Sequence, residues 1–166
     1  MAAQNPRKSV LQAFKSRQHR HDDCVSQAIA AAEHSCAHNG QRLTKLRRRV
    51  LELVWMSHKP VKAYEILTLL QRERDGAAPP TVYRALEFLQ NEGLVHRIES
   101  LNAFVGCGEP QRAHSGQFLI CRLCGSVGEM DDAELSRLIS SKAKRIGFQV
   151  DHEMIEIRGL CNNCRN

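Results

Sequence analysis

The sequence of 166 residues has no run of 18 apolar residues, and its charged N-terminus is not followed by a continuous apolar segment. Transmembrane helices and secretory signal peptides need such segments, so we expect a soluble, cytoplasmic protein without a membrane partner. No amphipathic stretch combines a basic face with large aromatic residues, which argues against attachment to a membrane surface. The sequence contains no internal repeat, so a repeat array is not expected either.

Positive charge is concentrated in the first half of the chain. The formal net charge is +6; residues 1–92 contain 15 Lys and Arg against 9 Asp and Glu, whereas residues 93–166 contain 9 against 9. This asymmetry predicts a polyanionic partner for the N-terminal half, and nucleic acid is favoured over membrane. The alternative is that a charge of +6 lies within the ordinary range of a soluble domain.

Four helices and a hairpin are expected in the N-terminal half, after a polar basic tail at residues 1–23. Apolar spacing with cap and stop signals predicts helices that begin at Cys24, after Thr44, near Ala63 and at Pro80. Strands at 94–99 and 103–107 should pair as a hairpin. This order is typical of a winged helix-turn-helix domain, here residues 24–107.

The helix that begins at Pro80 has the pattern of a recognition helix. Val82, Ala85 and Leu86 form an apolar stripe with Leu89. Three side chains near its N-terminus then face outward, where such helices contact base edges: Thr81, Tyr83 and Arg84. We expect Arg84 to contact a purine and Tyr83 a thymine methyl group or a phosphate. The alternative is an amphipathic helix with a solvated outer face.

Three consecutive arginines in the preceding helix could contact DNA phosphates: Arg47, Arg48 and Arg49. The N-terminal tail also contains possible metal ligands, which are His19, His21 and Cys24. These could bind a metal loosely, or they could belong to a solvated charged segment.

A second, smaller α/β domain is expected at residues 117–166, after a hinge rich in Gly, Pro and polar residues at 108–116. Strands are predicted at 117–121, 126–130 and 148–160. A helix with an Asp131/Glu134 capping box should carry an apolar face and end at Gly147. The predicted class is α+β, and the edge strand of this domain is a plausible dimerisation surface.

Two Cys-x-x-Cys pairs give the strongest chemical signal: Cys121 with Cys124, and Cys161 with Cys164, with 36 residues between the pairs. Two thiolates at this spacing can reach one ion, and two such pairs complete the closed tetrahedral shell of structural zinc. With seven cysteines in a chain expected in a reducing compartment, metal ligation is favoured over disulfides. A redox pair and an unliganded pair are the alternatives.

A second possible ligand set is scattered along the chain: His96, Cys107, His114 and Glu129. Two nitrogens, one sulfur and one oxygen form a credible four-coordinate zinc shell near the hinge. Alternatively, His96 is a satisfied core histidine and Cys107 a small buried apolar residue.

Several short segments occur in a characteristic order: Leu43-Thr44, Pro80-Thr81-Val82-Tyr83-Arg84-Ala85-Leu86, Gly93-Leu94-Val95-His96, Cys121-x-x-Cys124-Gly125 and Gly159-x-Cys161-x-x-Cys164. Over residues 40–164 this pattern closely resembles the ferric uptake regulator (Fur) superfamily of bacterial metal sensors. Further segments are most similar to its zinc uptake regulator branch: Val95-His96-Arg97-Ile98-Glu99-Ser100, Phe104-Val105-Gly106-Cys107, Ala113-His114-Ser115 and Gly125-Ser126-Val127-Gly128-Glu129.

The resemblance implies two zinc ions per subunit. The four paired cysteines would hold the structural ion, and the regulatory ligands would be His96, Cys107, His114 and Glu129. It further implies a homodimer whose zinc-loaded form binds a pseudo-palindromic double-stranded DNA operator and represses zinc uptake genes.

The sequence departs from the iron-sensing branch just before the first Cys-x-x-Cys pair. Gln117 and Phe118 stand where those members carry a histidine-rich cluster, which argues against iron sensing. His152 lies where a third-site histidine would fall. An iron or peroxide sensor of the same superfamily remains the alternative. A zinc-dependent hydrolase is not favoured, because a four-ligand shell leaves no position for water, so neither an enzyme nor a small-molecule substrate is expected.

Overall fold

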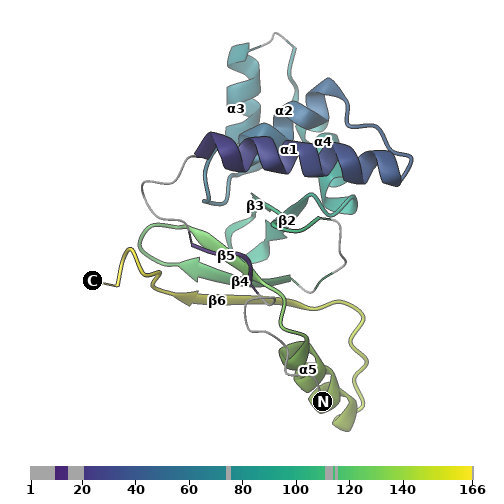
Figure 1. The fold of residues 1–166 in the computed structure, drawn as a ribbon, viewed down its shortest axis with the longest axis vertical. Coiled ribbons are helices and arrows are strands. Elements are labelled where there is room, and N and C mark those ends of the chain that lie inside the picture. Colours follow the sequence, from purple (N-terminus) through teal and green to yellow (C-terminus); the bar gives the residue numbers. More distant parts are fainter. Residues whose placement is uncertain (1–9, 15–20, 74–75, 111–113, 115, 166) are drawn as a thin grey trace. The chain divides into compact units, whose positions relative to one another are not determined.

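A computed structural model describes residues 10–14, 21–73, 76–110, 114 and 116–165 (Figure 1). The chain divides into two compact units. The N-terminal unit is Lys15–Arg112, and the C-terminal unit joins Met1–Phe14 to Ala113–Asn166. Helices dominate the first unit and strands the second, which confirms the predicted α+β class.

Helices and one hairpin make up the described part of the N-terminal unit. The helices are α1 (His21–His38), α2 (Lys45–Val54), α3 (Ala63–Glu73) and α4 (Pro79–Asn91). The hairpin consists of β2 (Val95–Ile98), the short 3₁₀ helix η2 (Glu99–Leu101) and β3 (Ala103–Gly106). His96 pairs with Val105 across this hairpin. Helix α1 begins three residues earlier than predicted and therefore includes the end of the expected tail.

Local signals set the ends of these helices as predicted. The Thr44 hydroxyl accepts a hydrogen bond of 3.4 Å from the Arg47 amide and caps α2. Helix α4 has prolines in its first turn, and Gly93 follows its end with φ of +67°. Because Gly93 has no Cβ, the chain can turn directly from α4 into the hairpin.

The predicted apolar stripe of α4 is the centre of the core of this unit. Val82, Ala85, Leu86 and Leu89 are buried, with exposed fractions of 3% or less, and α4 packs against α2 and α3. Burial of this face leaves Tyr83 and Arg84 exposed. The core therefore fixes which side of α4 faces solvent.

The hairpin meets the helical core through Trp55, the C-cap residue that follows α2. A Cβ atom at Gly106 would lie 2.1 Å from the indole Cε2 and Nε1 atoms, so only glycine fits beneath this ring. The indole itself is 8% exposed. Close contact between glycine and tryptophan thus joins the end of β3 to α2.

We expect Gly106→Ala to lower the free energy of unfolding by about 1–3 kcal/mol, because the new methyl group must displace the indole. Trp55 is the only tryptophan, so its fluorescence during urea denaturation reports on this unit. Gly159→Ala in the C-terminal unit is the control for the same substitution without a clash, since a Cβ there has no atom within 4 Å, and its unfolding is followed by circular dichroism. Equal stability losses in the two variants would contradict the close-packing argument.

The C-terminal unit has a four-stranded sheet in the order β1-β5-β4-β6. Its strands are β1 (Val10–Gln12), β4 (Gly116–Cys121), β5 (Val127–Met130) and β6 (Met154–Gly159). Strands β4 and β6 run parallel, and the other pairs are antiparallel. Strand β6 is shorter than the predicted 148–160, and it lies at one edge of the sheet.

Strand β1 was not predicted, because Val10–Gln12 lies within the residues that we expected to form a tail. It pairs with β5, with Val10 opposite Met130 and Gln12 opposite Glu129. Three residues with one exposed end give almost no periodicity from which a strand could be recognised. Pairing with a distant strand, not local propensity, forms this element.

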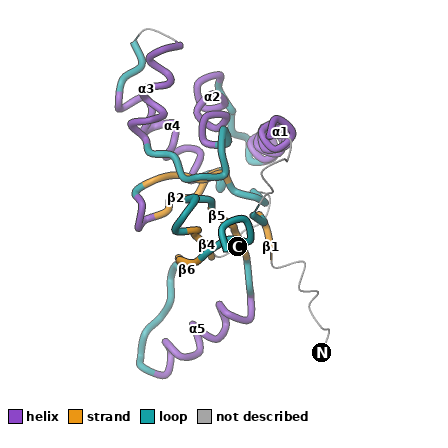
Figure 2. The backbone as a smooth tube through the Cα atoms, turned by 90° about the vertical axis from the view of Figure 1, so that its left-hand side faces the viewer, coloured by secondary structure: helices purple, strands orange, loops and turns teal. Residues whose placement is uncertain are grey.

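Helix α5 (Ala133–Arg145) differs from the prediction in its cap and its burial. Its N-cap is Asp132, not Asp131: Oδ1 accepts hydrogen bonds from the Glu134 and Leu135 amides at 2.9 and 3.1 Å. None of its residues is buried, including those of the predicted apolar face. Figures 1 and 2 show α5 beyond the strands, not over a face of their sheet.

None of the described helices has both the length and the apolar character that a membrane-spanning segment requires.

Candidate metal centres and nucleic-acid interface

Parallel pairing of β4 with β6 brings the two Cys-x-x-Cys pairs together. Cys121 ends β4 opposite Gly159, and the Arg122 amide donates a hydrogen bond of 2.9 Å to the Gly159 carbonyl. A tight turn follows each of the two strands. In the first turn the Gly125 amide donates a hydrogen bond to the Cys121 carbonyl, and in the second the Cys164 amide donates to the Cys161 carbonyl. Two turns at one end of the sheet therefore face each other.

The sulfurs of Cys121, Cys124, Cys161 and Cys164 all lie within 4.8 Å of one another. Cys124 Sγ and Cys161 Sγ are 3.7 Å apart. Tetrahedral coordination with Zn–S bonds of about 2.3 Å requires sulfurs separated by about 3.8 Å. The Cys124–Cys161 separation is therefore that expected of two thiolates that share a zinc ion.

The four thiols differ in how readily they ionise. Backbone hydrogen bonds at Cys124 and Cys161 lower the pKa of the Cys121 thiol to about 6, and the Ser126 hydroxyl lowers the pKa of Cys124. Burial raises the pKa of Cys164 to about 12, and the neighbouring thiols add to this rise. Burial, and next the Cys121 thiol, also raise the pKa of Cys161. Four adjacent thiolates repel one another, so complete deprotonation requires a cation among them.

Two residues of the second predicted set meet within the C-terminal unit. His114 Nε2 lies 2.7 Å from Glu129 Oε1, and both side chains are nearly inaccessible to solvent, at 4% and 3% exposed. Glu129 is held by β5, between β4 and β1. A buried carboxylate is costly unless it is paired, so this contact provides a polar partner, and it also sets two potential metal-ligand atoms side by side.

The other two residues of that set lie on the hairpin of the N-terminal unit. His96 is opposite Val105, and Cys107 is two residues beyond Val105 along the chain. Because side chains alternate along a strand, His96 and Cys107 point to the same face of the hairpin. The Cys107 amide donates to the Leu94 carbonyl at 3.0 Å, and its sulfur accepts from the Glu109 amide at 3.4 Å.

Gln117, one of the residues that depart from the iron-sensing pattern, has a structural role. Its buried amide donates to Ser136 Oγ at 3.1 Å and to Glu153 Oε1 at 3.3 Å, and its Oε1 accepts from the Asp132 amide at 3.0 Å. These bonds attach α5 to β4. His152 belongs to no convergent group of three or more His, Cys, Asp or Glu within the ranges that the structure describes.

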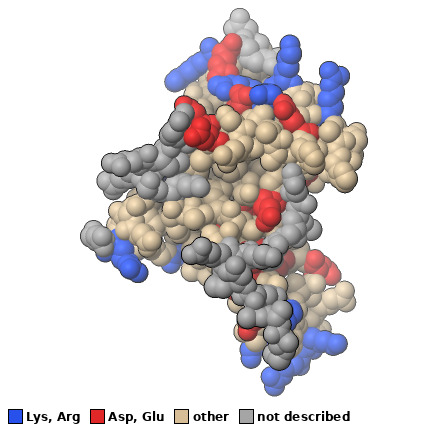
Figure 3. All heavy atoms as spheres, in the orientation of Figure 1, with Lys and Arg blue, Asp and Glu red and all other residues tan. Residues whose placement is uncertain are grey.

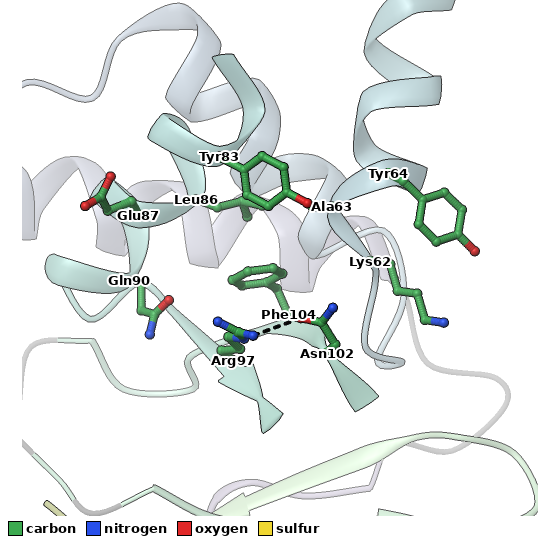
Figure 4. Close-up of a pocket in the computed structure, with 10 residues that line it drawn as sticks. All are labelled: Lys62, Ala63, Tyr64, Tyr83, Leu86, Glu87, Gln90, Arg97, Asn102 and Phe104. Carbon is green, nitrogen blue, oxygen red and sulfur yellow. Dashed lines mark hydrogen bonds between the residues drawn. The ribbon is translucent and has the colours of Figure 1, made fainter. Parts of the chain in front are cut away.

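The outer face of α4 borders a groove of about 680 Å³ within the N-terminal unit (Figure 4). Helix α4, the start of α3 and the hairpin form its walls. Its lining residues are Lys62, Ala63, Tyr64, Tyr83, Leu86, Glu87, Gln90, Arg97, Asn102 and Phe104. Arg97 donates a hydrogen bond of 3.0 Å to Asn102 Oδ1 across the hairpin turn. The groove therefore combines aromatic, basic and amide groups, which suit contacts to a nucleic acid.

The three consecutive arginines are engaged within the protein. Arg48 pairs with Glu33 and Glu52, and Arg49 pairs with Glu52 and Glu73. Arg47 stacks on the Phe88 ring at 3.4 Å and donates to the Arg42 carbonyl at 2.8 Å. Figure 3 accordingly shows acidic and basic side chains interleaved over the helical unit. Phosphate contact by these three arginines stays a prediction. Their contacts within the protein also give them a structural role, which is to connect α2 to neighbouring segments.

Arg84 differs from those arginines: it is exposed, and no ion pair with it is found among the residues that the structure describes. Thr81 is half-buried in the first turn of α4. Tyr64, which sequence reasoning missed, is 61% exposed and shares the groove with Tyr83, which is 59% exposed. The signal in the sequence was a large aromatic residue near the start of a helix, beside the positions of its apolar stripe.

Comparison with known proteins supports the expected family. The model of the ferric uptake regulator family matches residues 38–158. A zinc uptake regulation protein from Escherichia coli (strain K12) is 39% identical over 141 residues, which cover 84% of this chain and 82% of that protein.

Two solved structures have the same fold over most of their length. A zinc uptake regulator complexed with zinc and DNA aligns with a TM-score of 0.78 at 37% identity, covering 84% of this chain and 93% of that one. Holo XcZur aligns with a TM-score of 0.75 at 46% identity, covering 82% of this chain and 96% of that one. The resemblance drawn from the short sequence segments is confirmed, including the zinc uptake branch.

Proposed function

The chain belongs to the ferric uptake regulator family, and from this premise we propose that it is a zinc-responsive transcriptional repressor of the cytoplasm. Its zinc-loaded homodimer would bind a pseudo-palindromic operator and repress zinc uptake genes. The observation that carries the proposal is its ligand chemistry: four convergent cysteines, together with a second set that contains a thiol. A thiolate ligand favours zinc over the hard-ligand environments of iron sensors.

Each subunit would hold two zinc ions. Cys121, Cys124, Cys161 and Cys164 form a shell without an open position, so this ion is structural. The regulatory set takes His96 and Cys107 from the N-terminal unit and His114 and Glu129 from the C-terminal unit. Zinc in this shell would supply a bond between the units, and ligands drawn from both make their arrangement depend on zinc.

The regulatory ligands are positioned by features already present in each unit. The hairpin directs His96 and Cys107 to one face, and β5 holds Glu129 within 2.7 Å of the His114 ring. Because these side chains are already held in place, less conformational entropy is lost when an ion binds. The four-ligand set leaves no position for a reactive water, so we propose no hydrolytic activity.

Exposed apolar residues support a homodimer. Leu138, Ile146, Phe148 and Ile157 of the C-terminal unit are 48–84% exposed in the single chain. Exposed apolar side chains on α5, on the segment that follows it and on β6 are unfavourable in water, and a second copy would cover them. Dimerisation would also give each operator half-site its own recognition helix.

Metal-dependent DNA binding tests the proposed function. We expect binding-site selection from random duplexes with zinc-loaded protein to yield a pseudo-palindrome, and chelation to weaken its binding by about 100-fold, equivalent to about 2.7 kcal/mol. Iron(II) under anaerobic conditions is the comparison. If iron(II) supported tighter binding than zinc, or if peroxide released the iron-loaded protein from DNA, an iron or peroxide sensor would replace the proposal.

Arg84 is the residue on which sequence readout should depend. Arg84→Ala should cost about 1–3 kcal/mol, concentrated at one base position of each half-site, because an arginine can bond to two acceptors of guanine. The measurement is fluorescence anisotropy with operators mutated one base pair at a time. Arg137→Ala is the control, as this exposed residue on α5 makes the same change in charge. A uniform loss across all sequences would contradict base readout by Arg84.

A further inference from the structure

We infer a further metal site in the N-terminal unit, formed by His21, Cys24 and His58. Their potential ligand atoms, two imidazole nitrogens and one sulfur, lie within 4.8 Å of one another. This set is separate from the cysteine cluster and from the proposed regulatory ligands. Zinc is the ion that we assign to it.

The first turn of α1 supplies two of these ligands. His21 and Cys24 are three residues apart in a helix, so their side chains lie on one face. His58 comes from the turn between α2 and α3. Its ring centroid lies 4.8 Å from that of His21, with the planes inclined by 73°. The fold therefore brings a distant turn against the beginning of α1.

Ligand type and accessibility both suit zinc. Two imidazoles and one thiolate form a mixed nitrogen and sulfur set, which this borderline-soft ion prefers. All three side chains are half-buried, so an ion can enter from solvent while part of its surroundings stays dry. Three protein ligands leave the fourth tetrahedral position for water. We therefore expect this site to bind zinc less tightly than the four-cysteine shell does.

Packing of the two imidazoles against each other is the simpler explanation of their contact. An edge-to-face ring pair is favourable without any ion. It does not account for the sulfur of Cys24 within reach of both rings, which is the arrangement that a shared ion requires. Loss of cobalt binding on removing any one ligand therefore separates the two explanations.

Binding here would connect to the hairpin through one tryptophan. The His58 ring lies 6.3 Å from Trp55 at an angle of 85°, and Trp55 in turn packs on Gly106. Cys107 is the next residue along the chain. An ion at this site would fasten the first turn of α1 to the residues behind the hairpin and stabilise the N-terminal unit.

Cobalt(II), used as a probe for zinc, gives the sharpest test. The experiment uses full-length Cys107→Ser protein with zinc in the four-cysteine shell, so that the regulatory thiol cannot contribute. We expect cobalt to produce a thiolate-to-cobalt charge-transfer band. The band should be lost with additional Cys24→Ser and reduced at least tenfold with additional His58→Ala. Additional His38→Ala, at the exposed far end of α1, should leave it unchanged.

Zinc stoichiometry by mass spectrometry provides an independent measurement in the wild-type background. Wild-type protein should bind one more zinc per subunit than His58→Ala. Absence of the charge-transfer band, its survival in the Cys24→Ser or His58→Ala variant, or equal zinc content would overturn the inference. Neither readout requires DNA binding, so these outcomes leave the proposed repressor function unaffected.

Discussion

Cys161→Ser should remove the structural zinc and unfold much of the C-terminal unit, with loss of the dimer and of DNA binding. Structural zinc contributes about 10–16 kcal/mol in zinc-finger peptides, comparable with the whole stability of an ordinary domain of about 5–15 kcal/mol. Cys161 is 3% exposed and lies among three other sulfurs, so its hydroxyl replacement is a poor ligand in a buried position.

Zinc content by mass spectrometry, circular dichroism and size-exclusion chromatography together measure this effect. Asn162→Ser is the matched control, because it places a serine at the neighbouring exposed position of the same turn. This control should retain its zinc and its dimer. Full zinc content in Cys161→Ser would show that the four cysteines do not share an ion.

Cys107→Ser should abolish the effect of zinc on DNA binding while leaving the fold and the structural zinc intact. Serine is close to cysteine in size, but it cannot supply a thiolate, so the regulatory shell loses its softest ligand. The roughly 100-fold gain in operator affinity expected on adding zinc should disappear. Anisotropy titrations with and without zinc measure this gain directly.

Glu129→Gln tests whether the C-terminal unit contributes a ligand to the regulatory zinc. It removes the charge of the carboxylate that lies 2.7 Å from His114, and it should eliminate the same zinc-dependent gain. Glu109→Gln is the control, since the backbone amide that donates to the Cys107 sulfur is unchanged. If only Cys107→Ser abolished the response, ligation by both units would be wrong.

Local patterns predicted most of the fold because each depends on residues close together in the sequence. The α4 stripe of Val82, Ala85, Leu86 and Leu89 follows from helical periodicity, and all four are buried. Helix α5 shows the limit of this reasoning. Its apolar pattern was recognised, yet Leu138 remains 52% exposed, because periodicity identifies an apolar face without identifying what covers it.

For charged residues, tertiary packing supplies partners that the sequence does not indicate. Arg48 and Arg49 looked available for phosphates, but Glu33 and Glu73 approach them from other helices. The partner of a surface charge is set by tertiary packing. An arginine run therefore indicates a basic segment of sequence. The electrostatic potential at the protein surface, which a polyanion such as DNA experiences, also depends on the acidic residues that the fold places beside the arginines.

The sequence alone determined the family, the helix limits marked by Thr44 and Gly93, and the chemistry of the four paired cysteines, because spacing along the chain carries that information. Tertiary structure decided what depends on distant segments. Parallel pairing of β4 with β6 brought Cys121 beside Cys161, pairing with β5 made a strand of Val10–Gln12, and packing of the α2–α3 turn placed His58 against His21. Contacts between residues far apart in the sequence leave no local periodicity, so only the folded chain reveals them.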